Sequence, residues 1–275
     1  MPAEYRYETV IVEKVDDIAW VTLNRPEKRN AMSPQLNHEM CDVMARLETD
    51  PEAKVLVLGG AGKAWCAGMD LELFFRDLDD KPAERAVAIF ETNEWRWNRL
   101  FTYPKPTIAM VHGYCFGGGF TQLIACDFAI ASEDATFGLS EVNWGIIPAG
   151  IVGKALMDAL SYRDALYIAL TGKPFSAKEA ERMRLINEAV PADKLKEKTL
   201  ELANLLKALN PEALRGTKQA LKNVRGMGSD QALDYLGAKF AETKFRDRSG
   251  GYSKGIGQFI DEKSYRPGLA AYRKD

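Results

Sequence analysis

Two glycine-containing segments have the composition of strand ends that expose backbone N–H groups. AWCAGMD (residues 64–70) and CFGGGFT (residues 115–121) each follow an apolar run typical of a buried strand. Two N–H groups that converge on one point would form an oxyanion hole, which stabilises charge developing on a carbonyl oxygen. Glycine suits such a position because a Cβ atom would obstruct a bulky acyl group. Two unrelated turns are the alternative, and the triple glycine at 117–119 weakens it.

Glu141 is a candidate for proton transfer. It lies in TFGLSEVNWGIIPAG (residues 136–150), where apolar and aromatic residues flank it, so we expect partial burial. Removal from water raises the pKa of a carboxyl group toward the range useful for general acid–base catalysis. A surface glutamate in a loop is the alternative interpretation.

Several other polar residues have two interpretations each. Lys28 and Arg29 could bind phosphate groups, or they could belong to a solvated loop. Asp70 and Glu72 could take part in a site, or they could cap the helix that begins there. His112 comes directly before a glycine turn, where we expect a structural role.

The glycines do not form a nucleotide-binding motif. A dinucleotide fingerprint needs G-x-G-x-x-G in the first βα unit and an acidic residue about 20 positions later. Here the glycines are contiguous and lie far into the chain. A P-loop needs a lysine after its glycines, but Phe120, Thr121 and Gln122 follow them. A nucleotide-dependent enzyme is therefore disfavoured.

Composition excludes further classes of protein. The 275 residues include 37 basic and 39 acidic side chains and carry a formal charge of −2, which argues against a nucleic-acid partner. We expect no membrane span, because no apolar run reaches about 18 residues, and the N-terminus MPAEYRYETV lacks the apolar core of a secretory signal. Four cysteines without metal-binding spacing and two histidines predict no metal site and a reduced, cytoplasmic protein.

The elements that position these residues begin with two strands and a helix. Residues 7–15 and 17–25 alternate as strands do. Ser33 and Pro34 then form a helix start, with serine as N-cap and proline in the first turn. One face of this helix carries the apolar residues Leu36, Met40, Val43, Met44 and Leu47.

Strands and helices alternate over residues 5–140, which predicts an α/β core. Further strands are expected at 53–62, 106–114 and 128–134, and a helical region at 84–101. Beyond residue 150 little is typical of strand, and we expect helices at 150–160, 162–170, 176–184, 193–208, 211–225 and 230–246. We therefore divide the chain into a core domain, 1–200, and a helical C-terminal region, 201–275.

Taken together, these motifs resemble the crotonase (enoyl-CoA hydratase/isomerase) superfamily along nearly the whole chain. NRPEKRNAMS, AWCAGMDL, KPTIAMVHGYCFGGGF, ACDFAIASEDATFGLSEVNWGIIP and TGKPFSAKEAERMRLINEAVP stand in the order of that family. The resemblance implies a core of ββα superhelical turns and a C-terminal helical region that forms trimers, often paired as hexamers, and closes the active site. It also implies a coenzyme A thioester as substrate, with no other cofactor.

Site residues follow from the motif positions in this resemblance. The N–H groups of Met69 and Gly118 would form the oxyanion hole, with Glu141 as the catalytic acid–base. The coenzyme A site would be lined by the loop that contains Lys28 and Arg29 and by the segment from Ala67 to Leu71.

Ordinary enoyl-CoA hydratases have a second catalytic glutamate three residues after the middle glycine, where this chain has Thr121. One glutamate, together with Met69, the SE-x-NWG motif and a PGLxAY tail, resembles the hydroxycinnamoyl-CoA (feruloyl-CoA) hydratase/lyase subgroup. The resemblance implies hydration of feruloyl-, coumaroyl- or caffeoyl-CoA, then retro-aldol cleavage to an aromatic aldehyde and acetyl-CoA. Residues expected beside the acyl group are Phe74, Thr121, Ser140, Trp144 and Tyr235.

One departure from the subgroup concerns the phenol of the substrate. The subgroup binds the phenolic hydroxyl with two tyrosines, whose positions here correspond to Phe74 and Gly237. Tyr235 lies two residues from the second position, which on a helix turns it by about 200°. Two other functions therefore stay open: an enoyl-CoA hydratase or isomerase acting on a different acyl-CoA, and an inactive CoA-binding or assembly protein, against which Glu141 argues.

Overall fold

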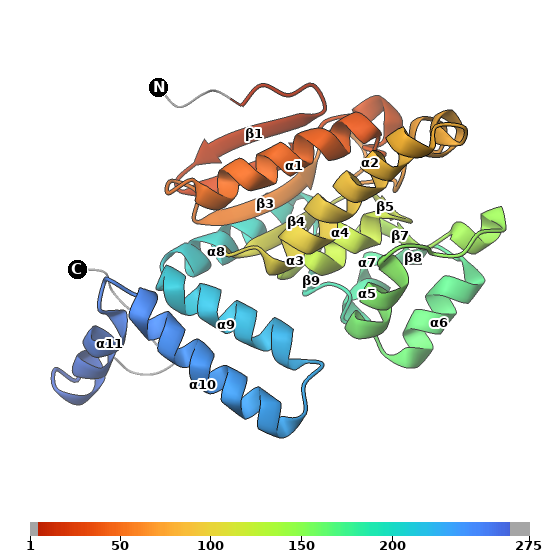
Figure 1. Ribbon diagram of the computed structural model, residues 1–275. Coiled ribbons are helices and arrows are strands. Elements are labelled where there is room, and N and C mark those ends of the chain that lie inside the picture. Colours follow the sequence, from red (N-terminus) through yellow and green to blue (C-terminus); the bar gives the residue numbers. More distant parts are fainter. Residues whose placement is uncertain (1–4, 265–275) are drawn as a thin grey trace. The chain divides into compact units, whose positions relative to one another are not determined.

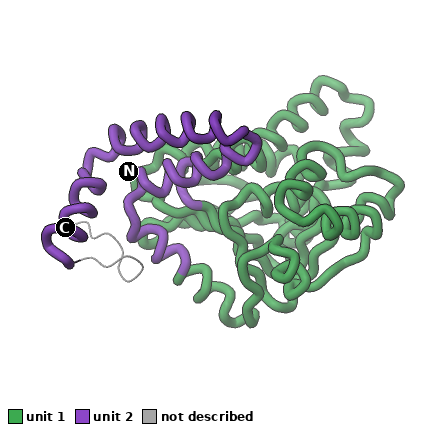
Figure 2. Tube along the Cα trace, turned by 90° about the horizontal axis from the view of Figure 1, so that it is seen from below, with its two compact units in different colours: residues 1–103, 107–201 green, residues 104–106, 202–275 purple. Residues whose placement is uncertain are grey.

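The computed structural model describes residues 5–264. The chain divides into two compact units, coloured separately in Figure 2. Unit 1 comprises Met1–Tyr103 and Thr107–Glu201, and unit 2 comprises Pro104–Pro106 and Leu202–Asp275. The PGLxAY tail lies outside the described residues.

Unit 1 is built on a six-stranded sheet in the order β1-β2-β3-β4-β6-β9 (Figure 1). The first two strands pair antiparallel, and all the other pairs are parallel. The four apolar residues that open β3 are all buried, as expected for a strand covered on both faces. The strands are β1 (Val10–Val15), β2 (Ile18–Leu23), β3 (Val55–Gly60), β4 (Thr107–Val111), β6 (Phe128–Ser132) and β9 (Glu188–Val190).

A second, smaller sheet has the order β5-β7-β8. Its strands are β5 (Tyr114–Phe116), β7 (Thr136–Gly138) and β8 (Phe175–Ser176). They are too short to show an alternating pattern, so the sequence did not predict β7 or β8 as strands. In the described residues beyond 150, strand is confined to β8 and β9.

Helix α1 (Pro34–Thr49) lies across one face of the large sheet (Figure 1). The predicted cap is confirmed, because the backbone N–H of Leu36 donates a hydrogen bond to Ser33 Oγ at 3.2 Å. The predicted apolar face is also confirmed, since all five of its residues are buried: Leu36, Met40, Val43, Met44 and Leu47.

The helical region expected at 84–101 is confirmed, but it is not one regular helix. Helix α2 (Pro82–Asn93) passes into a π-helical turn, Glu94–Arg99, and then into α3 (Leu100–Thr102). Trp95 is buried in this turn and donates from Nε1 to Asn37 Oδ1 at 2.8 Å. The wide turn changes which side chains face inward, and Arg96 becomes one of them.

The helices expected after residue 150 are present, which confirms an α/β protein with a helical C-terminal region. Helix α11 follows them and was not expected, because three of its ten residues are glycine. The remaining helices are α4 (Gly119–Ala125), α5 (Val152–Ala159), α6 (Tyr162–Thr171), α7 (Ala177–Arg182), α8 (Leu195–Lys207), α9 (Pro211–Val224), α10 (Ser229–Arg246) and α11 (Gly251–Ile260).

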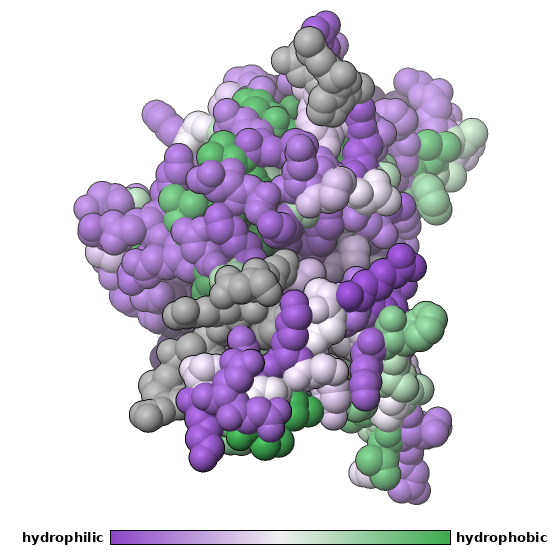
Figure 3. Space-filling model, turned by 90° about the vertical axis from the view of Figure 1, so that its left-hand side faces the viewer, coloured by the Kyte–Doolittle hydropathy of each residue, from purple (hydrophilic) through white to green (hydrophobic). Residues whose placement is uncertain are grey.

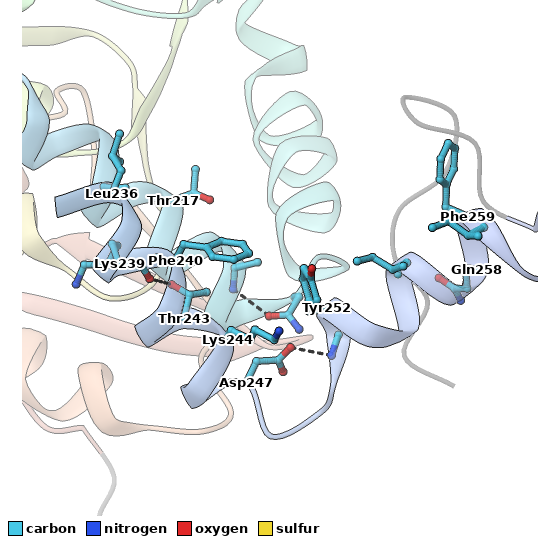
Figure 4. Close-up of a pocket in the computed structure, with 18 residues that line it drawn as sticks. Thr217, Leu236, Lys239, Phe240, Thr243, Lys244, Asp247, Tyr252, Gln258 and Phe259 are labelled. Atoms are coloured by element: carbon cyan, nitrogen blue, oxygen red, sulfur yellow. Dashed lines mark hydrogen bonds between the residues drawn. The ribbon is translucent and has the colours of Figure 1, made fainter. Parts of the chain in front are cut away.

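Unit 2 contains a largely apolar cavity of about 680 Å³ between α9, α10 and α11 (Figure 4). The rings of Phe240 and Tyr252 meet edge to face at its wall, with centroids 5.9 Å apart. Hydrophilic side chains cover most of the molecular face shown in Figure 3. None of the helices in residues 5–264 is long and apolar enough to cross a membrane.

Candidate active site

The structure brings the two glycine-containing segments side by side. Cys66 and Cys115 form a parallel β-bridge between them. The N–H of Cys66 donates to the Tyr114 carbonyl at 3.0 Å, and the N–H of Phe116 donates to the Cys66 carbonyl at 3.0 Å. The alternative of two unrelated turns is therefore wrong.

A second bridge, between Met32 and Met69, sets the direction of the first proposed donor. Met32 donates to the Gly68 carbonyl at 2.8 Å, and Asp70 donates to the Met32 carbonyl at 3.0 Å. Successive backbone groups in such a pairing point to opposite sides, so the N–H of Met69 faces away from Met32. Within the described part of the chain this N–H has no hydrogen-bond acceptor.

The N–H of Gly118 is free in the same sense. Its neighbour Gly117 donates to the Gly138 carbonyl at 2.9 Å, but over residues 5–264 no acceptor is present for Gly118. A Cβ atom on Gly68 would lie 3.3 Å from the nitrogen of Gly118, so the two segments approach closely here. Each segment thus contributes one free N–H group, as an oxyanion hole requires.

The structure adds a second reason for glycine at 118 to the expected one. We expected that a Cβ atom would obstruct an acyl group. It would also contact the protein: Arg96 Nη1 at 3.1 Å, Met32 Cε at 3.2 Å and Met69 Cγ at 3.2 Å. Gly117 is different again, because its φ of +51° is left-handed and its Cβ would face Glu141.

Glu141 begins a short 3₁₀ turn, Glu141–Trp144, and is half-buried as predicted. Oε1 would lie 3.4 Å from a Cβ atom on Gly117, and Oε2 is buried without a hydrogen-bond partner among the described residues. Burial raises the pKa of the Glu141 carboxyl, and a hydrogen bond from its own backbone only partly opposes this. A fully exposed loop glutamate is thus excluded, and the group is suited to exchange protons.

Thr121 lies one turn into the segment that begins at Gly118, and its N–H donates to the Gly118 carbonyl at 3.2 Å. The side chain is fully buried, and Oγ1 has no hydrogen-bond partner in the described structure. A threonine hydroxyl does not ionise near neutral pH, so this position cannot replace a second carboxylate.

Arg96 also lies at this site, and sequence reasoning missed it. It is 7% exposed, and Nη1 donates to the Gly118 carbonyl at 3.2 Å and lies 3.8 Å from Met69 Sδ. Burial lowers the pKa of Arg96 to about 10, so the guanidinium remains charged at neutral pH. The sequence held one relevant pattern: an arginine between two tryptophans, Trp95 and Trp97, in a helical region.

Asp70 holds the segment next to Met69. Its Oδ1 accepts hydrogen bonds from the N–H groups of Glu72 at 3.1 Å and Leu73 at 3.0 Å, which confirms a helix-capping role. Its Oδ2 forms a buried ion pair with Arg25 at 2.9 Å. Burial raises the pKa of Asp70, but the hydrogen bonds and the Arg25 charge outweigh it and hold the pKa below its usual value.

The loop expected to line the coenzyme A site lies beside both segments. Ala67 donates to the Arg29 carbonyl at 3.0 Å, and the Arg29 guanidinium lies 5.4 Å from the centre of the Tyr114 ring. Lys28 is exposed and pairs with Glu72 at 3.7 Å. Leu71 is likewise exposed. Two exposed basic side chains therefore flank the proposed hole.

The residues expected around the acyl group are only partly brought together. Phe74, in the π-helical turn Leu71–Phe75, is buried and packs with Met69 in a small apolar cluster. Ser140 precedes Glu141, and Trp144 ends the same turn with 67% of its surface exposed. Tyr235 lies on α10 in unit 2, so its expected place beside the substrate stays a prediction.

Among residues 5–264, no three His, Cys, Asp or Glu side chains gather in a way that could hold a metal ion. All four cysteines are free thiols, three of them buried.

Comparisons with known proteins agree on one family. The enoyl-CoA hydratase/isomerase family model matches residues 13–264. Over 272 residues the chain is 52% identical to a hydroxycinnamoyl-CoA hydratase-lyase from Pseudomonas fluorescens, covering 98% of this chain and 99% of that protein. The fold is similar to that of an enoyl-CoA hydratase from Polaromonas sp. JS666, with a TM-score of 0.84, 27% identity and coverage of 92% and 97%. It is also similar to that of an enoyl-CoA hydratase from Bacillus anthracis, with a TM-score of 0.84 and 27% identity. That match covers 93% of this chain and 97% of the other.

Proposed function

The chain belongs to the enoyl-CoA hydratase/isomerase (crotonase) family, and we propose that it is a lyase that hydrates 4-hydroxycinnamoyl-CoA thioesters and then cleaves the product. Feruloyl-, coumaroyl- and caffeoyl-CoA would each give the aromatic aldehyde and acetyl-CoA. One observation carries the proposal: the Glu141 carboxylate lies against Gly117, next to the free N–H group of Gly118, while Thr121 occupies the place of a second glutamate. The hydratase-lyase from Pseudomonas fluorescens, at 52% identity, supports the same activity.

Hydration is the first half of the proposed reaction. The Glu141 carboxylate takes a proton from water as the oxygen of that water bonds to Cβ. The electrons of the double bond move to the thioester oxygen, and the resulting enolate accepts hydrogen bonds from the N–H groups of Met69 and Gly118. Each such donor is worth about 3 kcal/mol of transition-state stabilisation. Glu141 then returns the proton to Cα, which leaves the β-hydroxy thioester and a carboxylate.

Cleavage uses the same groups a second time. Glu141 takes the proton of the β-hydroxyl, the carbonyl of the aldehyde forms, and the bond between Cα and Cβ breaks. Its electrons again form an enolate in the same pair of N–H groups, and protonation of Cα by Glu141 gives acetyl-CoA. One polarising site and one acid–base group therefore serve both halves.

The other site residues are assigned roles in the same proposal. Lys28, Ala67 and Leu71 would contact coenzyme A. The acyl group would lie among Phe74, Thr121, Ser140, Trp144 and Tyr235. We propose no cofactor beyond the coenzyme A of the substrate, a trimer or dimer of trimers as the assembly, and a cytoplasmic location.

The test is to incubate the protein with feruloyl-CoA and to measure vanillin and acetyl-CoA. We expect the two products in equal amounts, and we expect none from Glu141→Gln. A β-hydroxyacyl-CoA that accumulates without aldehyde would contradict the cleavage step.

A second candidate function is hydration or isomerisation of a different acyl-CoA. It is favoured by Phe74 and Gly237, which supply no hydroxyl for a phenol. A substrate panel of cinnamoyl-, coumaroyl-, feruloyl- and crotonyl-CoA separates the two. Turnover of crotonyl-CoA without turnover of the aromatic thioesters would favour the second function.

A further inference from the structure

Arg96 is a buried cation without a balancing anion. It is 7% exposed, and Nε is buried with no hydrogen-bond partner in the part of the chain that the structure describes. No carboxylate within residues 5–264 pairs with it, in contrast to Arg99 three residues later, which pairs with Glu48 at 2.6 Å. Buried charges in proteins are normally paired, because removing them from water is costly. Arg96 is therefore expected to meet its anion during function.

The groups around Arg96 do not supply that anion. The Cys66 thiol is buried, and burial raises its pKa to about 11, so it is neutral at pH 7. Glu141 lies at the neighbouring glycine, where its carboxylate faces the Cβ position of Gly117, while Arg96 faces the Cβ position of Gly118. The Glu141 carboxylate and the Arg96 guanidinium thus approach different residues of the glycine segment, and they form no ion pair with each other.

The contacts of Arg96 point to where an anion would form. Nη1 donates to the carbonyl of Gly118 and lies against Met69 Sδ, and these two residues carry the free N–H groups. An oxygen held by the Gly118 N–H would lie about 3 Å from that nitrogen, and so within roughly 9 Å of Nη1. Opposite charges still attract one another over such a distance in a protein, where the effective dielectric constant is well below that of water.

We propose that Arg96 is a positioning residue for the enolate: it holds the Gly118 carbonyl, one peptide beyond the donor N–H, and supplies the positive charge that balances the thioester oxyanion. The inference rests on the enolate chemistry of the proposed function. The Arg96 charge would stabilise the enolate in the steps that make or break a bond at Cα. It would contribute little to the binding of the neutral thioester. The other anion that Arg96 could balance is a permanent carboxylate on the acyl group.

The central test compares Arg96→Met with Arg96→Lys. Methionine fills similar space without charge, and an apolar replacement of an unpaired buried charge is commonly well tolerated. We expect Arg96→Met to keep a melting temperature at or above that of the wild type while kcat falls about 10- to 100-fold and KM stays within threefold. Arg96→Lys should recover part of the lost kcat. Arg85→Gln, which removes a partly exposed arginine paired with Asp79, is the matched control.

A second readout measures enolate formation directly. Acetyl-CoA is incubated with the protein in D₂O, and deuterium at its methyl group is followed by mass spectrometry. Exchange needs only the enolate, so it tests Arg96 even if feruloyl-CoA is not cleaved and the proposed function fails. We expect a loss of exchange in Arg96→Met that matches the loss of kcat.

Two results would overturn the inference. One is exchange in Arg96→Met within twofold of the wild type. The other is unchanged turnover of feruloyl-CoA combined with loss of binding for an acyl-CoA that carries a carboxylate, such as 2,3-dehydroadipyl-CoA. In that case Arg96 would serve substrate selection instead.

Discussion

A Cβ atom on Gly117 would lie 3.4 Å from Oε1 of Glu141, so this carboxylate packs directly against the glycine. Gly117 also has a left-handed φ of +51°. The backbone therefore requires glycine here, and the acid that we place in the reaction lies in contact with it.

Gly117→Ala should separate the effect on the backbone from the effect on Glu141. A non-glycine residue at this φ costs about 1–2 kcal/mol, and the methyl group would also lie directly against Oε1 of Glu141 and restrict the position of this carboxylate. Gly250→Ala is the matched control, because Gly250 has a φ of +69° and open space around its Cβ position. Urea unfolding should show similar losses of stability for the two variants, but kcat should fall at least tenfold in Gly117→Ala alone. Equal activities would contradict the proposed place of Glu141.

Glu141→Gln should abolish turnover and leave coenzyme A binding intact. The amide keeps the shape of the side chain but cannot accept a proton, and loss of a general acid–base group typically costs about 10²- to 10⁴-fold. Rates on feruloyl-CoA and calorimetric binding of coenzyme A measure the two effects. Glu13→Gln, at an exposed glutamate of β1, is the control. Retained turnover in Glu141→Gln would exclude the alternative of an inactive CoA-binding protein. It would also show that a group other than Glu141 transfers the proton.

The pH dependence should follow the ionisation of Glu141. Both halves of the reaction begin with the carboxylate form, and burial raises the pKa of this group above its ordinary value of 4.5. As pH falls, the active form should therefore be lost at a higher pH than an exposed glutamate would give. The measurement is kcat/KM against pH, with its acid limb centred above 4.5. A profile that stays flat down to pH 4.5 would contradict the assignment.

Asp70→Asn should destabilise the protein by about 3 kcal/mol at pH 7, because it leaves the buried Arg25 charge unpaired. Glu197→Gln breaks an exposed pair with Lys194 and should cost less than about 1 kcal/mol. The folded protein holds the pKa of Asp70 below 3.8, so its stabilisation is complete at neutral pH and is lost as pH falls through the folded-state pKa. Urea unfolding at pH 7 and pH 3 should show the difference between wild type and Asp70→Asn shrinking in acid.

Phe74→Tyr should improve the recognition of phenolic substrates. Phe74 is buried beside Met69, so a hydroxyl at its ring would be placed near the acyl group. A hydrogen bond that discriminates between substrates is worth about 1.4 kcal/mol, or tenfold. We expect the ratio of kcat/KM for coumaroyl-CoA over cinnamoyl-CoA to rise about tenfold. Phe75→Tyr, at the more exposed neighbouring ring, is the control and should leave the ratio unchanged.

Much of the fold could be predicted because local pattern and tertiary structure agree. The cap at Ser33 and the apolar face of α1 follow from spacing alone, and the order of the motifs led to the crotonase-like fold, which the family match confirms. The short strands β7 and β8 depend on pairing with distant segments, which no local pattern records. Helix α11 was missed because its glycines disfavour a helix in isolation.

The candidate site could be predicted where it depends on backbone N–H groups, as in the two glycine-containing segments at 64–70 and 115–121. Arg96 could not, because arginine is usually exposed and a regular helical period does not anticipate a π-helical turn. The reason for glycine at 118 also needed the structure, since the atoms around its Cβ position come from Met32, Met69 and Arg96.

The two bridges that set the site, Met32 with Met69 and Cys66 with Cys115, join segments that are distant along the chain. Met69 lies in no helix or long strand, and Gly118 is the N-cap of the short helix α4. The two N–H groups therefore come together only when the tertiary structure has formed, and no isolated fragment would retain the pair. A molecule that has lost either bridge would lose the stabilisation from at least one donor, about 3 kcal/mol, so nearly all of the activity of a sample should come from its fully native molecules.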